Sequence, residues 1–186
     1  MNRQTLPGKI AKWISLVLLL VVLGMAGLKL LYPFPYREQV DHWTSVYSVD
    51  TYLVAALIRT ESHFRPHATS SVGAIGLMQI MPTTGEWIAD NIGVDGFTTG
   101  DLYEPETNIR LGTWYLRYLI DRFGGIDTAL AAYNAGPGNA ERWQDDAQMM
   151  FPETSEYVRK VVEGKRAYRL LYSLPFLGFL LRAVPI

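Results

Sequence analysis

The sequence predicts a mainly α-helical protein in which one helical domain follows a single N-terminal membrane-spanning helix. Two observations predict this fold class. After residue 37, apolar residues recur at the three- and four-residue spacing of helices, and no segment alternates convincingly as a strand would. Before residue 33, an apolar stretch has roughly the 20 residues that a helix needs to cross a bilayer. The 186 residues are enough for one compact domain and a short appendage.

Composition excludes several classes of function. The net charge is −1 and no long basic run occurs, so nucleic acid is not an expected partner. The chain has no cysteine, which rules out disulfides, cysteine-ligated zinc, a thiol nucleophile and a lipidated cysteine.

Residues 13–32 are the predicted transmembrane anchor. Arg3, Lys9 and Lys12 precede the anchor without any acidic residue, so the positive-inside rule places residues 1–12 in the cytoplasm and the rest of the chain outside. The expected location is the cell membrane, with a single pass and the domain on the extracytoplasmic side. Two alternatives remain open: a signal peptide cleaved near residues 24–26, and a buried core helix.

The prolines of residues 33–37 predict a stiff linker between the anchor and a domain at residues 38–172. The last segment, residues 173–186, is apolar but too short to span a bilayer. We expect this tail to pack against the domain, and the alternative is contact with the outer leaflet.

Helix boundaries inside the domain follow from capping residues. Asp50 is expected to cap a helix that reaches about His63. Four further helices are expected. One begins at a capping box of Thr83 and Glu86, and a second carries an apolar stripe from Ile109 to its end at Gly124. A third opens at Asp127, and a fourth is capped by Thr154.

Glu61 stands out because it lies on the apolar stripe of its own helix, four residues after Leu57 and three after Ile58. Burial disfavours the charged form of a carboxyl group and raises its pKa toward the range of a general acid. The alternatives are a structural ion pair of Glu61, for example with Arg59 or Arg65, and simple exposure at the margin of the stripe.

Polar and aromatic residues follow at three separate turns. Residues 70–82 combine small residues with Gln79, residues 131–136 add Tyr133 and Asn134, and residues 153–158 add Glu153 and Tyr157. Such groups, gathered around one acid, are what a carbohydrate-binding cleft requires.

The sequence resembles the catalytic domain of the soluble lytic transglycosylase family, which has a lysozyme-like fold. The matching segments occur in the family's order and are residues 61–66, 73–82, 108–109, 131–138 and 153–158. The resemblance covers roughly residues 38–172, and the ordered set is far more specific than any one segment.

The resemblance implies that Glu61 is the catalytic residue of an enzyme that cleaves peptidoglycan glycan strands and leaves a 1,6-anhydro end. No cofactor or metal is implied, and Tyr133 is expected close enough to orient Glu61. The implied substrate-binding residues are Ser70, Gln79, Met81, Tyr133, Asn134, Glu153 and Tyr157.

Three other functions compete with this prediction. A hydrolase of the goose-type lysozyme kind shares the fold and a single main glutamate, and a membrane-tethered wall-binding module needs no catalysis. A metal site at Glu61, His63 and His67 is disfavoured because Pro66 interrupts the helical spacing that such ligands use.

Overall fold

A computed structural model describes residues 6–145 and 149–173. Its elements are α1 (Leu6–Leu31), α2 (Arg37–Tyr47), α3 (Thr51–Ser62), α4 (Pro82–Ile92), the 3-10 helix η1 (Thr99–Tyr103), α5 (Pro105–Phe123), α6 (Ile126–Ala135), α7 (Pro137–Asp145) and α8 (Pro152–Ser173). The described part of the chain contains no strand, and the mainly helical fold class is confirmed. The chain divides into two compact units, Met1–Phe34 with Leu170–Ile186, and Pro35–Arg169.

The smaller unit contains α1, which covers the predicted anchor at residues 13–32 except for its last residue and ends at Leu31. The apolar side chains between Trp13 and Leu23 are largely exposed. Among the described residues, however, no helix meets the combined length and apolar content for a membrane crossing, so the predicted span is not confirmed. The Tyr172 hydroxyl donates to the Tyr32 carbonyl at 2.8 Å. Of the predicted tail, residues 174–186 lie outside the described residues.

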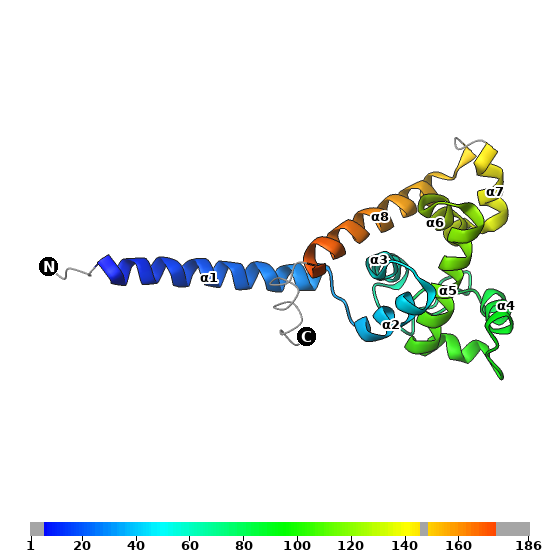
Figure 1. Cartoon of the computed structure of the whole chain (residues 1–186), viewed down its shortest axis with the longest axis horizontal. Helices are drawn as coiled ribbons and strands as arrows, with labels where there is room; N and C mark the ends of the chain where they lie inside the picture. The colour runs from blue at the N-terminus through cyan, green and yellow to red at the C-terminus, as the bar shows by residue number, and fades with distance from the viewer. Residues whose placement is uncertain (1–5, 146–148, 174–186) are drawn as a thin grey trace. The chain divides into compact units, whose positions relative to one another are not determined.

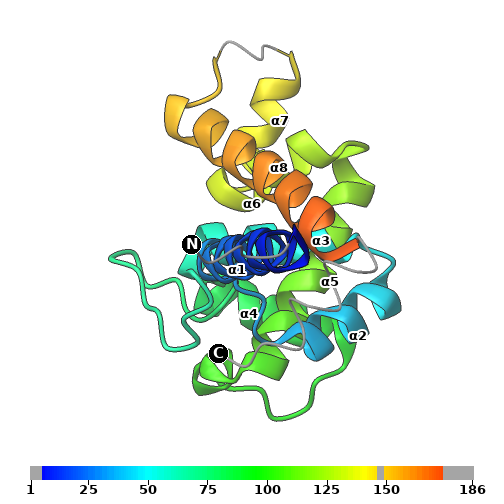
Figure 2. The same ribbon diagram turned by 90° about the vertical axis from the view of Figure 1, so that its left-hand side faces the viewer.

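The larger unit is built around α5. This helix contacts α2, α4, η1 and α6, while α6 also packs against α7 and α2 against α3. In Figure 1 and Figure 2, α6 and α7 lie toward one end of α5, and α2 and α4 lie toward the other. Because α5 carries buried residues from Asn108 to Phe123 along its length, one helix connects both ends of the domain.

The core comes from the apolar stripes of several helices and from the segment between α3 and α4. Its fully buried side chains include Leu57, Ile58, Leu77, Met78, Ile88, Leu102, Ile109, Leu116, Leu119 and Tyr168. Removing this apolar surface from water is the main force that holds the helices together.

Two of the predicted helix boundaries are confirmed by their caps. The Asp50 carboxylate accepts hydrogen bonds from the backbone N–H groups of Tyr52 and Leu53, which begins α3 at Thr51. Gly124, in the left-handed conformation at φ 70°, ends α5.

Two other caps are corrections. The predicted capping box of Thr83 and Glu86 is wrong, since α4 begins at Pro82, which occupies the first turn without needing a side-chain cap. Thr154 is not a cap either. Helix α8 begins two residues earlier at Pro152, and the Thr154 hydroxyl donates to Asn134 Oδ1 at 2.9 Å.

Three elements were not expected from the sequence: α2, η1 and α7. The predicted loop at residues 93–105 contains η1, whose start has the capping box of Thr98 and Asp101. The turn expected at residues 135–138 occurs at Gly136, and α7 begins directly after it. These three helices pack against α5 or α6. They do not change the predicted position of Glu61, which lies on α3.

Candidate active site

Glu61 lies in the last turn of α3, and its own helix determines its surroundings. Leu57 and Ile58 on the same stripe are fully buried, and Glu61 itself is partly buried. Burial raises the pKa of Glu61 from 4.5 to about 7, and a hydrogen bond from Tyr157 opposes part of that rise. The carboxyl group therefore exchanges its proton near neutral pH.

Tyr157 comes from α8 and donates its hydroxyl to Glu61 Oε1 at 2.6 Å. The ring is buried, with 8% of its surface exposed. Burial, followed by the nearby charge of Glu61, raises the pKa of Tyr157 well above its usual value. Tyr157 therefore remains a neutral donor that orients the carboxyl group.

Tyr133, which the sequence suggested as the orienting residue, makes a different contact. Its hydroxyl donates to the Met78 carbonyl at 2.9 Å, joining α6 to the segment before α4. Burial raises the pKa of Tyr133 well above its usual value, and the charge of Glu61 adds to the effect. The charge of Glu61 therefore acts on Tyr133, while the Tyr133 hydroxyl holds the backbone at Met78.

The segment between α3 and α4 is held by side chains from the surrounding helices. Ser62, at the end of α3, donates its hydroxyl to the Leu77 carbonyl at 2.7 Å. Asn108, fully buried on α5, accepts from the Met78 N–H at 2.7 Å and donates to the carbonyls of Ile75 and Leu102. Satisfying these buried groups fixes the segment against the core, since each unmet partner would cost about 1–3 kcal/mol.

Gly76 is required for this close approach. Its φ is 83°, and an added Cβ would stand 2.2 Å from Asn108 Nδ2 and 2.3 Å from the Leu102 carbonyl oxygen. No other residue type fits without moving Asn108.

Three of the predicted binding residues belong to this segment. The Ser70 hydroxyl accepts from the Ala74 N–H at 2.9 Å. Gln79 has a left-handed backbone at φ 49°, and its side-chain N–H groups donate to Ala68 and Gly76 carbonyls. Met81, immediately before α4, is 39% exposed. These hydrogen bonds keep the segment in one conformation and offset the cost of the unusual backbone at Gln79, which is about 1 kcal/mol.

The remaining predicted residues lie on α6 and α8. Asn134 is exposed and accepts the hydrogen bond from Thr154, and Glu153 is exposed in the first turn of α8. The structure therefore joins α3 to α8 through the Glu61–Tyr157 hydrogen bond and α6 to α8 through the Asn134–Thr154 hydrogen bond.

His67, one of the two histidines of the alternative metal site, lies beside an aromatic ring. The centroid of its ring is 6.0 Å from that of Tyr103.

The transglycosylase SLT domain family model matches residues 38–153, more than half of the chain. The chain belongs to this family. The SLT-family segments seen in the sequence are thus confirmed as a family resemblance, and they include Glu61, the Met78–Gln79 region and Tyr133.

Relatives of the SLT domain include proteins named as soluble and proteins named as membrane-bound. The soluble lytic murein transglycosylase of Escherichia coli is 35% identical over 151 residues, which are 74% of this chain and 23% of the relative. The membrane-bound lytic murein transglycosylase C of Edwardsiella ictaluri is 37% identical over 117 residues, 58% of this chain and 33% of the relative.

A solved structure supports the fold of the SLT domain. It is an inactive glutamate-to-glutamine mutant of lytic transglycosylase Slt from Pseudomonas aeruginosa, with a TM-score of 0.74, 32% identity, and coverage of 80% of this chain and 26% of that one. This chain thus spans about a quarter to a third of the length of the proteins it resembles.

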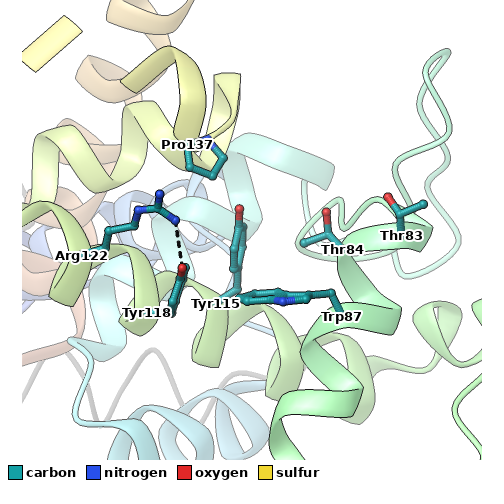
Figure 3. Close-up of a pocket in the computed structure, with 7 residues that line it drawn as sticks. All are labelled: Thr83, Thr84, Trp87, Tyr115, Tyr118, Arg122 and Pro137. Atoms are coloured by element: carbon teal, nitrogen blue, oxygen red, sulfur yellow. Dashed lines mark hydrogen bonds between the residues drawn. The ribbon is translucent and has the colours of Figure 1, made fainter. Parts of the chain in front are cut away.

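The SLT domain also carries an open groove of about 430 Å³ that the sequence did not reveal. Trp87 of α4 packs against Tyr115 and Tyr118 of α5 and lines it together with them, and Arg122 and Pro137 complete one side (Figure 3). A signal was present in the sequence, because the three-residue spacing of Tyr115 and Tyr118 places two aromatic rings on one face of α5.

Proposed function

We propose that this chain is a peptidoglycan lytic transglycosylase that acts in cell-wall remodelling or turnover. The bond that it cleaves is the β-1,4 glycosidic bond between N-acetylmuramic acid and N-acetylglucosamine. The observation that carries the proposal is Glu61, a partly buried carboxyl group with a pKa of about 7 that accepts a hydrogen bond from Tyr157. A general acid is most effective when its pKa lies near the working pH.

In the first step, protonated Glu61 gives its proton to the glycosidic oxygen. The bond from that oxygen to C1 of the muramoyl residue breaks, and the N-acetylglucosamine side leaves as an alcohol. The substrate's acetamido group stabilises the positive charge that develops at C1. The desolvated surroundings that raise the pKa of Glu61 favour this proton transfer.

In the second step, ionised Glu61 removes the proton from the muramoyl 6-hydroxyl. The 6-oxygen forms a bond to C1, and the product is a 1,6-anhydro ring. Glu61 ends protonated as it began and water is not consumed, so the enzyme is a lyase. One carboxyl group thus performs the acid and base roles that most glycosidases divide between two.

The residues around Glu61 have supporting roles in this proposal. Tyr157 orients the carboxyl group and stabilises its ionised form between the two steps. Tyr133 holds the backbone at Met78, so that Gln79 and Met81 present a fixed surface to the sugar. Ser70, Asn134 and Glu153 are proposed sugar-binding groups at the margins of the site.

Mass spectrometry of digested sacculi tests the reaction. The expected products are 1,6-anhydro-muropeptides from the wild-type protein, with none from Glu61→Gln at equal protein concentration. Continued release of anhydro products by Glu61→Gln would refute the assignment of Glu61. Reducing ends would instead identify a lysozyme-type hydrolase, and binding without turnover in a zymogram would identify a wall-binding module.

We also propose that residues 13–32 anchor the enzyme in the cell membrane with its domain outside. Support comes from the continuous helix α1 and the exposure of its apolar side chains, for which a lipid environment removes the cost of contact with water. One of the relatives is named as a membrane-bound transglycosylase.

Fractionation of cells tests the anchor. The full chain should stay with membranes through an alkaline carbonate wash, while a variant lacking residues 1–32 should be released. A full chain that washes off would contradict the anchor. Recovery of a mature protein that begins near residue 27 would show that the segment is a cleaved signal peptide.

A further inference from the structure

Helix α8 carries the hydrogen-bond donor to Glu61, and other contacts fix this helix against α3. Tyr157 reaches Glu61 at the C-terminal end of α3. At the N-terminal end of α3, the side chains of Lys165 and Arg169 pair with Asp50. The residues of α8 therefore hold both ends of the helix that carries the catalytic acid.

Between these two ends, the backbones of α3 and α8 approach each other closely. Gly164 of α8 is buried against Ala56 of α3, and an added Cβ at Gly164 would lie 3.1 Å from the Ala56 Cβ. Carbon atoms in good contact are about 3.5–4.0 Å apart, so a methyl group here would move the helices apart by a few tenths of an ångström. Glycine is a poor helix former, and close packing is the physical reason for its presence within α8.

Asp50 uses its two carboxylate oxygens for different contacts. Oδ1 accepts from the backbone N–H groups of Tyr52 and Leu53 and caps α3. Oδ2 accepts from Arg169 and lies 3.4 Å from the Lys165 Nζ atom. The Asp50 side chain is 26% exposed, so solvent screens these ion pairs and they contribute little to stability. They nevertheless join the first residue before α3 to two successive turns of α8.

We propose that Gly164 and Asp50 are positioning residues for the cleavage reaction. They set the distance and register at which α8 presents the Tyr157 hydroxyl to the Glu61 carboxyl group. The hydrogen bond between these two groups is 2.6 Å long, and a shift of α8 by a few tenths of an ångström lengthens or misaligns it. The inference rests on the proposed function and identifies what holds its catalytic acid in place.

The titratable groups that face Glu61 come from two helices. Tyr157 of α8 donates to Glu61 and thereby lowers its pKa, against the larger effect of burial. Tyr133 of α6 is held by the Met78 carbonyl and not by α8. A displacement of a few tenths of an ångström is too small to admit water. A displaced α8 therefore weakens the contact that stabilises ionised Glu61 and leaves its burial in place, so its pKa should rise.

The Gly164→Ala variant tests the close approach of the two helices. NMR titration of the Glu61 carboxyl group should give a pKa higher than in the wild type by up to about one pH unit. The kcat for strand cleavage at neutral pH should fall about threefold or more, with KM within about twofold of the wild type. Because alanine is the better helix former, a weakened α8 would not explain these changes.

A compensating substitution and a matched control accompany this variant. Adding Ala56→Gly to Gly164→Ala should restore both the pKa and kcat, because the methyl group has moved from one helix to the other. Gly100→Ala is the control, since its added Cβ would meet Thr98 Oγ1 at 3.6 Å, an ordinary contact. It should leave the titration of Glu61 unchanged.

Asp50→Asn tests the ion pairs separately from the cap. Asparagine caps a helix as well as aspartate does, so α3 should still begin at Thr51 while the charge that attracts Lys165 and Arg169 is removed. The pKa of Glu61 should rise, by less than in Gly164→Ala. Asp121→Asn is the control, because it removes a comparable charge that pairs with Arg117 on α5.

The Tyr157→Phe background shows whether both residues act through Tyr157. In that background, Gly164→Ala and Asp50→Asn should no longer change the pKa of Glu61. An unchanged pKa in the single variants, a change that Ala56→Gly does not reverse, or a change that persists without the Tyr157 hydroxyl would overturn the inference. Asp50→Asn keeps the test decisive if Gly164→Ala does not fold. The titration needs no turnover, and absence of cleavage by the wild type would instead refute the proposed function.

Discussion

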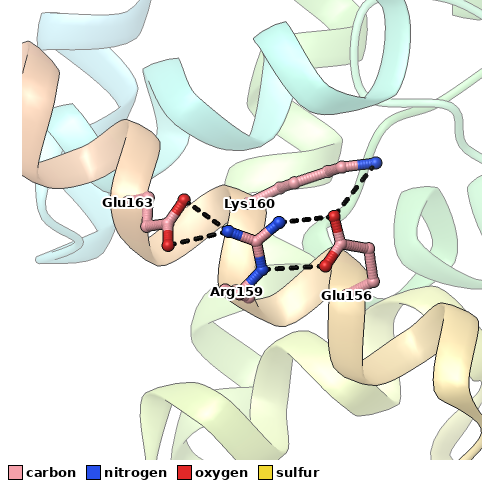
Figure 4. A network of polar contacts seen from close by, with 4 residues as sticks. All are labelled: Glu156, Arg159, Lys160 and Glu163. Carbon is pink, nitrogen blue, oxygen red and sulfur yellow. Dashed lines mark hydrogen bonds and ion pairs between the residues drawn. The ribbon is translucent and has the colours of Figure 1, made fainter.

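Tyr157 and Glu156 are neighbours on α8, but they belong to two different environments. Tyr157 is buried and donates to Glu61, whose pKa burial raises to about 7. Glu156 is accessible to solvent and pairs with Arg159 at 2.6 Å, a hydrogen bond that lowers the pKa of Glu156. Figure 4 shows Arg159 between Glu156 and Glu163, with Lys160 reaching Glu156 as well.

The contrast shows that the surroundings of a carboxyl group decide what it can do. Glu156 stays ionised near neutral pH because cations stabilise its charge, so it has no proton to give. Glu61 retains a proton up to about neutral pH because burial disfavours its charged form, and the hydrogen bond from neutral Tyr157 offsets only part of that effect. Surface ion pairs contribute little to stability. Burial of the Glu61 carboxyl group, in contrast, lowers the stability of the folded protein when the group is ionised, and it also leaves a proton that the group can donate in acid catalysis.

The largest expected difference lies in activity. Glu61→Gln should lower the rate of strand cleavage at least about 100-fold, because general acid–base catalysis contributes that much or more. Glu156→Gln makes the same chemical change on the exposed face of α8 and should leave the rate within about twofold. Initial rates of muropeptide release from sacculi measure both, and similar losses in the two variants would remove the distinction between the two environments.

The second difference lies in stability as a function of pH. Because the pKa of Glu61 is about 7 in the folded protein and 4.5 as its ordinary value, the folded state binds the proton more tightly, and stability falls as pH rises between these values. The full shift corresponds to roughly 3 kcal/mol, an upper value for a partly exposed group.

Glu61→Gln should therefore be more stable than the wild type at pH 8, by up to roughly 3 kcal/mol. The advantage should disappear near pH 4, where both states of the wild type are protonated. Urea unfolding at the two pH values measures it. An advantage that is the same at both pH values would mean that burial of the charge is not its cause.

The third expected effect concerns the hydrogen bond from Tyr157. Tyr157→Phe removes a donor to the ionised carboxylate, so the pKa of Glu61 should rise further and the loss of activity at alkaline pH should move to higher pH. The rate at neutral pH should fall roughly tenfold as the carboxyl group loses its orientation. Tyr47→Phe on α2 is the control, and an unmoved pH profile in Tyr157→Phe would contradict the role of this contact.

The smallest effect is expected from the exposed ion pairs among Glu156, Arg159, Lys160 and Glu163 on α8. Arg159→Ala breaks its pairs with Glu156 and Glu163, and the Tm should change by less than about 2 °C. Any difference should shrink at high salt, because salt screens exposed charges. A larger change that is independent of salt would show that Arg159 contributes through packing.

The sequence predicted those parts of the fold that depend on neighbouring residues. Asp50 and Gly124 act on the backbone within a few positions, so the start of α3 and the end of α5 were predicted correctly. Thr83 and Thr154 fit the same local rules, yet Pro82 and Pro152 begin their helices. At those two sites more than one local signal was present, and the prediction chose the wrong one.

The candidate site divides in a similar way. The position of Glu61 on an apolar stripe follows from the helical period alone, and the SLT segments were recognisable in order. The donor to Glu61, however, lies 96 residues away at Tyr157, whereas Tyr133 donates to the Met78 carbonyl. No spacing rule indicates which of two tyrosines reaches a given carboxyl group.

The sequence by itself determined that an acid would lie on the apolar side of α3, because helical periodicity needs only the order of residues. The tertiary structure alone decided that Tyr157 would hold this acid and that Trp87, Tyr115 and Tyr118 would share one groove. These contacts join α3 to α8 and α4 to α5. They depend on how whole helices pack, which is a property of the complete core.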